Sequence, residues 1–392
     1  MNGRPCDEVY GAFVAAEAEA ARQAGLLPST YLRQVRDPGP LPDVLARLSD
    51  QPEHRRAASA YVMRLVDGAR VEGARTLLAS HRELLAPSVE RFGVPAEVLV
   101  AIWGVESRFG AILGSTPVLR ALATLAACAD RKRDFWAGEF RAALALQAQR
   151  LRQPDQPALF GSWAGAVGPM QFMPTTARDW AMDCDGDGVA DVISSSIDAL
   201  GSAANYLAGH GWQRELPWGA PCTLPDPFDW ASFGPGASDG LEWRRYGDWS
   251  GAGVRVATRD VDAETPVRLV APDGARGGAF LVTRNFDAIL AYNRAIPYAL
   301  AVLLLAECAA GRLESGSVQT LLPPAFDQLL ERSEVVGLQR QLIARGWDTG
   351  GDDGIVGPKS RRAIARVQIE LGLPADGVPT KDLLNAIGGW PA

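Results

Sequence analysis

Histidine and cysteine are both scarce in this sequence, which limits the kinds of catalytic centre that it can build. The three histidines, His54, His81 and His210, do not cluster along the chain. A zinc site, or a triad that uses histidine as its base, therefore has few candidate residues. The five cysteines lack the spacing of metal ligands, and no CxxC motif occurs. Their odd number leaves at least one thiol unpaired within a monomer, and the pairing of the others stays open.

An excess of positive charge and long apolar runs are also absent. A formal net charge of −7 at pH 7 argues against a general nucleic-acid-binding protein, which would be basic. The longest apolar stretch, residues 296–310, contains Glu307 and is too short to span a membrane, so we expect a buried helix there. The N-terminal residues contain no apolar signal core, and no apolar segment precedes Cys6 as it would in a lipoprotein signal.

The rest of the composition is that of an ordinary soluble globular chain, with 47% hydrophobic and 22% charged residues. A length of 392 residues predicts two or three modules rather than one core. Helical periodicity dominates the first 210 residues. Glycine, proline and tryptophan then become frequent, and runs such as residues 267–270 indicate strands, so we expect a small β-containing insertion at about 213–280. Helical pattern returns at residues 286–310.

The clearest candidate for an acid catalyst lies on a predicted central helix. Leu99, Ile102 and Trp103 recur with the spacing of one buried helical face, and the next position on that face is Glu106. Burial disfavours a carboxylate, so we expect the pKa of Glu106 to be raised, as a general acid requires. Two alternatives are a partly exposed glutamate at a frayed helix end and an ion pair with Arg108.

A second segment, Gly161–Pro174, is crowded with glycine and other small residues. Such a segment lets the backbone approach a ligand closely, although a tight loop between helices would have the same composition. Gln171 is its one side chain with both hydrogen-bond donors and an acceptor. The segment contains no aspartate or glutamate.

A third segment, beginning at Asp183, has the pattern of a calcium-binding loop. Acidic residues occupy relative positions 1, 3 and 5, a glycine follows at position 6, and a backbone carbonyl is available at position 7. The usual closing glutamate is missing, so we expect a longer loop closed by Asp198. The predicted ligands are Asp183, Asp185, Asp187, Val189 and Asp198. The alternative is a solvated acidic turn.

Taken together, these motifs resemble the MltB-type lytic murein transglycosylases. The resemblance includes residues 105–110, 161–174, the acidic loop with residues 198–207, and 285–299, in family order over about residues 5–312. It implies a mainly α fold with a lysozyme-like helical catalytic domain and a small β insertion.

The C-terminal part of the chain resembles a second family. Residues 335–390, with their repeated Asp-Gly turns, resemble a small three-helix peptidoglycan-binding module, and residues 313–334 would be the linker that precedes it. The alternative is a generic helical tail.

The resemblance implies a reaction that cleaves the β-1,4 bond between N-acetylmuramic acid and N-acetylglucosamine. Glu106 would protonate the glycosidic oxygen and then, as a carboxylate, remove a proton from the muramyl 6-hydroxyl, which closes a 1,6-anhydro ring. Ordinary glycosidases need two carboxyl groups, whereas here the substrate supplies its own nucleophile. By position, the implied substrate-binding residues are Ser162, Gln171, Tyr292, Asn293, Tyr298, Arg131 and Lys132. The tyrosines would otherwise be packing residues, and the two cations a solvated surface cluster.

The resemblance also implies partners and a location. Peptidoglycan glycan strands are the expected partner, other cell-wall enzymes are candidate partners, and no nucleic acid is expected. We expect a monomer in the periplasm, with lipid anchoring to the outer membrane left open. No cofactor is expected for catalysis, and a Ca²⁺ ion is expected only in a structural role.

Two other functions remain open. One is a hydrolase on the same fold, for which Glu139 and Asp134 are poor candidates as the second acid, and the other is a non-catalytic wall-binding protein.

Overall fold

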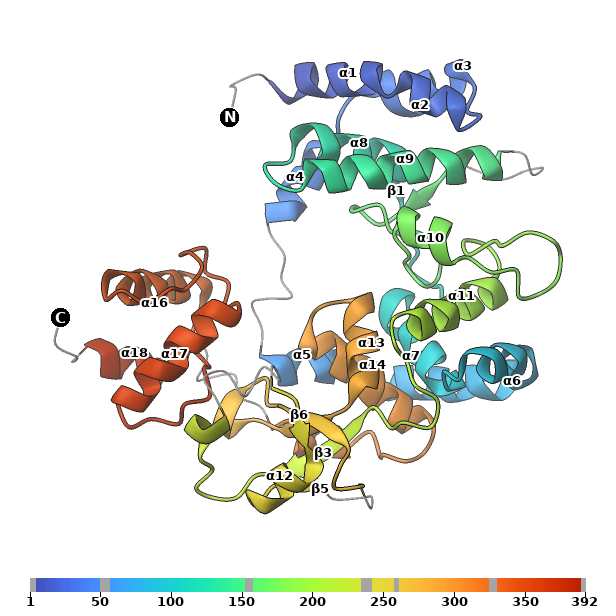
Figure 1. Cartoon of the computed structure of the whole chain (residues 1–392). Coiled ribbons are helices and arrows are strands. Elements are labelled where there is room, and N and C mark those ends of the chain that lie inside the picture. The colour runs from blue at the N-terminus through green and yellow to red at the C-terminus, as the bar shows by residue number, and fades with distance from the viewer. Residues whose placement is uncertain are drawn as a thin grey trace. The chain divides into compact units, whose positions relative to one another are not determined.

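A computed structural model describes residues 5–49, 57–151, 158–233, 242–256, 261–323 and 330–388. The chain divides into two compact units, and each is mainly helical (Figure 1). The first unit comprises Met1–Gln51 and Thr76–Tyr206, and the second comprises Pro52–Arg75 and Leu207–Ala392. Two helices, α6 (Gly68–Phe92) and α11 (Ser196–Gly209), continue from one unit into the other. The predicted mainly α class with a β insertion is confirmed.

The other elements of the first unit are α1 (Cys6–Ala16), α2 (Ala18–Gln23), α3 (Pro28–Tyr31), the π-helix η1 (Leu32–Arg36), α4 (Pro42–Ser49), α7 (Ala96–Ser107), β1 (Thr116–Pro117), α8 (Val118–Cys128), α9 (Arg133–Arg150), β2 (Phe160–Gly161) and α10 (Pro174–Trp180). The unit contains an apolar core to which α1, α8 and α9 contribute. Helices α8 and α9 lie side by side (Figure 1), and the fully buried Leu122, Leu125, Phe140 and Leu144 fill the space around them. Strands β1 and β2 form a short antiparallel pair.

A disulfide between Cys6 and Cys128 joins the first residue of α1 to the last residue of α8, 122 positions apart in the sequence. Helix α1 also packs on α8. The free cysteines of the described chain are Cys184, Cys222 and Cys308. The disulfide resolves the pairing that the sequence left open.

Helix α7 forms for reasons that are visible in its sequence. Pro95 has extended backbone at the N-cap position, which needs no N–H donor. The residues from Val98 to Gly104 are all buried, so this helix is apolar nearly all round. It ends at Ser107, because Arg108 takes the left-handed conformation at φ 50°. The helix therefore ends one residue after Glu106.

The second unit combines helices with a sheet. Its helices outside the C-terminal module are α5 (Ala58–Leu65), the 3₁₀-helix η3 (Trp230–Phe233), α12 (Tyr246–Gly251), the 3₁₀-helix η5 (Gly274–Arg276), α13 (Arg284–Tyr292), α14 (Ile296–Ala309) and α15 (Ser317–Leu321). Helix α14 packs on α5 and is almost wholly buried, as predicted for this apolar stretch. Within the described chain no single helix is long and apolar enough to cross a membrane, and the sharply bent pair α13–α14 meets the criterion only when taken together.

The β insertion is a five-stranded antiparallel sheet with the strand order β4-β6-β7-β3-β5. Its strands are β3 (Gly219–Thr223), β4 (Arg244–Arg245), β5 (Arg255–Val256), β6 (Pro266–Val270) and β7 (Ala279–Val282). Trp249, Val254 and Leu269 are buried in a core on this sheet. The strands lie between residues 219 and 282, and residues 234–241 and 257–260 of the predicted insertion at 213–280 lie outside the described chain.

The C-terminal module has the three helices expected of it, α16 (Arg332–Ala344), α17 (Pro358–Glu370) and α18 (Lys381–Gly388). Each Asp-Gly turn is held by a buried glutamine of the preceding helix. Gln339 binds the turn at Gly354, whose N–H donates to Oε1 at 2.8 Å, and Gln368 binds Gly377 in the same way at 2.8 Å. Both glycines have positive φ, so the turn and its clamp form a repeated unit.

The module shares contacts with the insertion inside the second unit. Ala365 and Ala375 belong to the same apolar core as the sheet, and the N–H of Ala275 donates to Asp376 Oδ2 at 2.9 Å. The predicted linker contains α15, and its residues 324–329 lie outside the described chain.

Candidate active site

Glu106 lies in the last turn of α7 and is half-buried, at the end of a helix whose other core positions are closed to solvent. Trp103, one turn earlier, has an exposed fraction of 7%. Its ring is in edge-on contact with His81 and Phe109, at centroid distances of 5.8 and 6.3 Å. Glu106 thus follows Trp103, a member of this aromatic cluster, on the same helix, and its role as the acid stays a prediction.

Ser107 fixes the end of this helix against the Gly161–Pro174 segment. Its hydroxyl donates to the carbonyl oxygen of Pro169 at 2.6 Å and accepts the N–H of Gly110 at 2.9 Å. The side chain is fully buried. Its acceptor is 62 residues away, so no local sequence pattern indicates this contact.

The backbone turns away from α7 through left-handed conformations. Arg108, Phe109 and Gly110 have φ values of 50°, 58° and 84°. Such a conformation is unfavourable for residues with a side chain and is found more often at functional sites than elsewhere. These three residues begin two positions after Glu106, the candidate acid.

The Gly161–Pro174 segment is a tightly folded loop closed by its own hydrogen bonds. Ser162 Oγ accepts the N–H of Ala166 at 3.0 Å, and Gln171 Nε2 donates to the Gly168 carbonyl at 2.8 Å. Both side chains are half-exposed. Gln171 Oε1 accepts no hydrogen bond from any described residue, so it is one polar atom of this loop that a ligand could use.

The glycines of this loop are surrounded by the protein itself. A Cβ atom at Gly161 would lie 2.1 Å from the Ala166 carbonyl, and one at Gly168 would lie 2.3 Å from the Val192 carbonyl. At Gly165 it would meet the Leu122 side chain at 2.6 Å. These positions favour the tight-loop alternative over the prediction that the glycines open the backbone to a ligand.

Glu139, considered as a second acid, has a structural role. It is buried, and its carboxylate accepts the N–H of Thr175 at 2.9 Å and the Thr175 hydroxyl at 2.6 Å. It therefore anchors the start of α10. Asp134 is exposed in the first turn of α9.

Three predicted substrate-binding residues lie in the second unit. Tyr292 ends α13 and is half-buried, and Asn293 follows it, with Oδ1 accepting the N–H of Ala295 at 3.1 Å. Tyr298 has an exposed fraction of 2%. Its burial favours the alternative that this tyrosine is a packing residue.

Arg131 and Lys132 are exposed at the start of α9. Lys132 is the N-cap residue and adopts a left-handed φ of 62°. The exposure is compatible with both a role toward an anionic ligand and a solvated surface cluster, so their predicted role stays a prediction.

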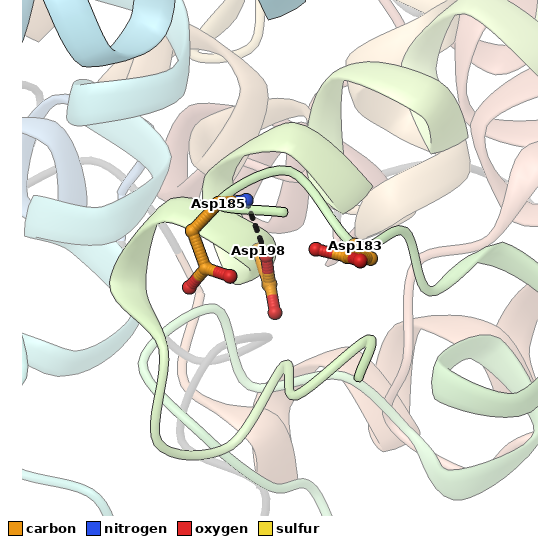
Figure 2. A group of neighbouring side chains, drawn as sticks. All are labelled: Asp183, Asp185 and Asp198. Atoms are coloured by element: carbon orange, nitrogen blue, oxygen red, sulfur yellow. Dashed lines mark hydrogen bonds between the residues drawn. The ribbon is translucent and has the colours of Figure 1, made fainter. Parts of the chain in front are cut away.

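The acidic loop between α10 and α11 brings three predicted metal ligands together. Carboxylate oxygens of Asp183, Asp185 and Asp198 all lie within 4.8 Å of one another, and Figure 2 shows the three side chains converging on one space. Asp187 lies outside this group of carboxylates. Asp191, at position 9 of the loop, instead faces Arg150, whose Nη1 lies 3.9 Å from its Oδ1.

Asp198 is the buried member of the group, with no exposed surface. Its Oδ1 accepts the N–H of Asp185 at 3.2 Å (Figure 2) and that of Cys184 at 2.7 Å, and its Oδ2 accepts that of Asp191 at 2.9 Å. The carboxylate at the start of α11 thus organises the loop that carries the other two. The prediction that Asp198, sixteen positions into the loop, replaces the usual closing glutamate agrees with this geometry.

Two protein families match the chain. The family described as "Transglycosylase SLT domain" matches residues 10–307, and the family described as "Putative peptidoglycan binding domain" matches residues 331–387. Membrane-bound lytic murein transglycosylase B of Escherichia coli (strain K12) is 42% identical over 123 residues, which are 31% of this chain. That match spans only 33% of the length of the curated relative.

Solved structures are similar over a larger part of the chain. SltB3 from Pseudomonas aeruginosa in complex with NAG-anhNAM-pentapeptide has 38% sequence identity and a TM-score of 0.82, with 97% of this chain and 99% of that chain covered. The lytic transglycosylase Slt35 of Escherichia coli in complex with calcium has 26% identity and a TM-score of 0.64, with 78% of this chain and 94% of that chain covered.

Proposed function

Because the chain belongs to the SLT family of lytic transglycosylases, we propose that it cleaves the β-1,4 bond between N-acetylmuramic acid and N-acetylglucosamine in peptidoglycan and leaves a 1,6-anhydromuramyl end. The observation that carries the proposal is the match with SltB3 along almost its whole length. That relative was crystallised with an anhydromuramyl peptide, which has the chemistry of the proposed product. The C-terminal module would add a second contact with the same polymer.

In the proposed mechanism Glu106 acts first as an acid and then as a base. Its proton goes to the glycosidic oxygen, and the bond from that oxygen to the anomeric carbon breaks. The 6-hydroxyl of the muramyl residue then forms a bond to the anomeric carbon and gives its proton to the Glu106 carboxylate. The acid is thereby restored and no water is consumed, so one carboxyl group suffices.

Several contacts of the first unit support this role. The carboxyl group lies at the end of a buried helix, and the Ser107–Pro169 hydrogen bond holds that end in place. Preorganisation of this kind reduces the cost of aligning an acid with a bond. A hydrolase would need a second carboxyl group to activate water. The Glu139 carboxylate already accepts two hydrogen bonds from Thr175, which gives it a structural role.

The test is the mass of the soluble products released from purified sacculi. We expect muropeptides one water lighter than their reducing counterparts. Products with reducing ends would indicate a hydrolase, and the absence of release, with the protein bound to the sacculi, would indicate a binding protein.

We further infer that the acidic loop holds a structural calcium ion. Three carboxylates so close together repel one another, and hard oxygen ligands are those that Ca²⁺ prefers. Asp183, Asp185 and Asp198 would hold the ion, with the Val189 carbonyl as a further candidate ligand. The calcium complex of Slt35 supports this inference. The ion would offset the repulsion and fix the loop between α10 and α11, which is a structural role.

The Cys6–Cys128 disulfide supports a location in the periplasm. Disulfides form and persist in oxidising compartments and are rare in the cytosol. In this fold the Cys6 thiol is engaged in the disulfide. Its reactivity toward lipid-transfer enzymes or thiol reagents in the folded protein would be the check.

A further inference from the structure

The C-terminal module carries a basic pocket beside a tryptophan. Helix α17 places Lys359, Arg362 and Arg366 at relative positions 1, 4 and 8, which lie on one face of a helix. All three side chains are exposed. Together with Trp347 and Asp348 they line a cavity of about 150 Å³. This local excess of positive charge contrasts with the net charge of −7 of the whole chain.

The charges of the pocket are only partly paired. Lys359 Nζ lies 2.8 Å from Asp348 Oδ2, and this contact is the main reason why the pKa of Asp348 is lowered. One end of the pocket therefore already stabilises a carboxylate. Arg362 and Arg366 form no ion pair with any residue that the structure describes. Their two guanidinium groups remain available to an anion.

The shape of the pocket restricts the ligand. The pocket is small, with a volume of about 150 Å³, and it is open to solvent because its three cations are exposed, so it can receive an ionised end group. The Arg366 guanidinium lies over the Trp347 ring, 5.6 Å from its centroid, so that face of the ring is not free to stack on a sugar. Guanidinium groups match carboxylates with paired hydrogen bonds.

We propose that this pocket binds a free carboxylate of the peptide part of peptidoglycan, with Arg362 and Arg366 as the anion-binding groups and Trp347 as the apolar wall. The glycan itself carries no ionised group where the muramyl carboxyl is in amide linkage, so the peptide supplies the negative charge. The proposal rests on the proposed function for the identity of the polymer. The module would then recognise peptide-bearing strands while the catalytic region acts on the sugars.

The experiment measures binding of the full chain to sacculi by co-sedimentation. All variants carry Glu106→Gln, so that the polymer is not consumed and any contribution of the catalytic region is the same in each. Intact sacculi are compared with sacculi whose carboxyl groups have been converted to neutral amides. We expect amidation to weaken binding of the parent about tenfold, since it removes charge-assisted hydrogen bonds to two guanidinium groups.

The matching variant is Arg362→Gln with Arg366→Gln. It should bind intact sacculi about tenfold more weakly than the parent, and amidation should then have little further effect, because the two changes remove one interaction. Arg340→Gln is the control: Arg340 is exposed on α16, is paired with Asp352 at 2.7 Å and lies outside the pocket, so its loss should leave affinity unchanged. Circular dichroism and melting temperature verify that each variant is folded.

Equal binding of the parent to intact and amidated sacculi would overturn the proposal, and this arm needs no pocket variant. Amidation that weakens the parent and the double variant by the same factor would also overturn it, because the carboxylates would then be recognised elsewhere. Cleavage is assayed separately, from the mass of products released by the chain with Glu106 intact. The expected binding pattern without anhydro products would support the pocket and refute the proposed function.

Discussion

Replacement of Ser107 by alanine tests whether the end of α7 is positioned by the loop that packs against it. The Ser107 hydroxyl donates to Pro169 and accepts from Gly110, at 2.6 and 2.9 Å, and it is fully buried. Alanine would leave the Pro169 carbonyl and the Gly110 N–H without these partners. A buried polar group left unsatisfied costs about 1–3 kcal/mol, so we expect a loss of roughly 2–4 kcal/mol in the free energy of unfolding.

The same substitution should slow the reaction, because Glu106 is the adjacent residue. A displacement of about 1 Å in a catalytic group can cost on the order of 100-fold in rate. We expect Ser107→Ala to lower kcat about ten- to 100-fold and to change KM much less, since the substrate contacts proposed here lie on other side chains. Release of soluble muropeptides gives the rates, and chemical denaturation gives the stability.

Ser29→Ala is a suitable control, because Ser29 is an exposed serine on α3 whose hydroxyl forms no hydrogen bond with the residues that the structure describes. It should match the unmodified protein in both measurements. If Ser107→Ala lost stability but kept its full kcat at a temperature where it is folded, the positioning role would be refuted.

Three further predictions follow from other contacts. Reduction of the Cys6–Cys128 disulfide, or replacement of both cysteines by serine, should lower the stability of the first unit by about 2–5 kcal/mol, and an unchanged melting temperature in reductant would contradict this. Calcium should raise the melting temperature, and Asp198→Asn should abolish the rise; a calcium effect that survives in this variant would place the ion elsewhere. Burial raises the pKa of Tyr10 and of Tyr31 well above their usual value, so the unfolded state loses these protons first. Stability should therefore fall as pH rises above about 10, and Tyr10→Phe should reduce that fall in denaturant titrations.

Features that depend on nearby residues could be predicted from the sequence. Helix α14 is a continuous apolar run and is buried as expected, and the acidic loop brings Asp183 and Asp185 together through local turn geometry. The prediction that Asp198 closes the loop is compatible with its place in the first turn of α11, where its carboxylate lies near those of Asp183 and Asp185. In each case the deciding contacts lie within a few turns of one another in the chain.

Features that depend on distant packing could not be predicted. The Cys6–Cys128 pairing follows from the packing of α1 on α8, and spacing alone does not reveal it. A glycine-rich segment looks the same in the sequence whether its glycines face a ligand or the protein's own carbonyl groups. Only the folded loop shows that Gly161 and Gly168 face carbonyl groups. Tyr298 is a similar case, since an apolar helix with a proline near its start does not reveal whether its tyrosine is buried.

The most direct test of the central claim is the source of the oxygen at the new chain end. Sacculi are digested by the protein in water enriched in heavy oxygen, and the products are analysed by mass spectrometry. If Glu106 transfers a proton to and from the substrate's own hydroxyl, the muramyl ends will be anhydro forms without heavy oxygen, and Glu106→Gln will release almost none. Reducing ends that carry heavy oxygen from the solvent would contradict the account, because water would then be the nucleophile.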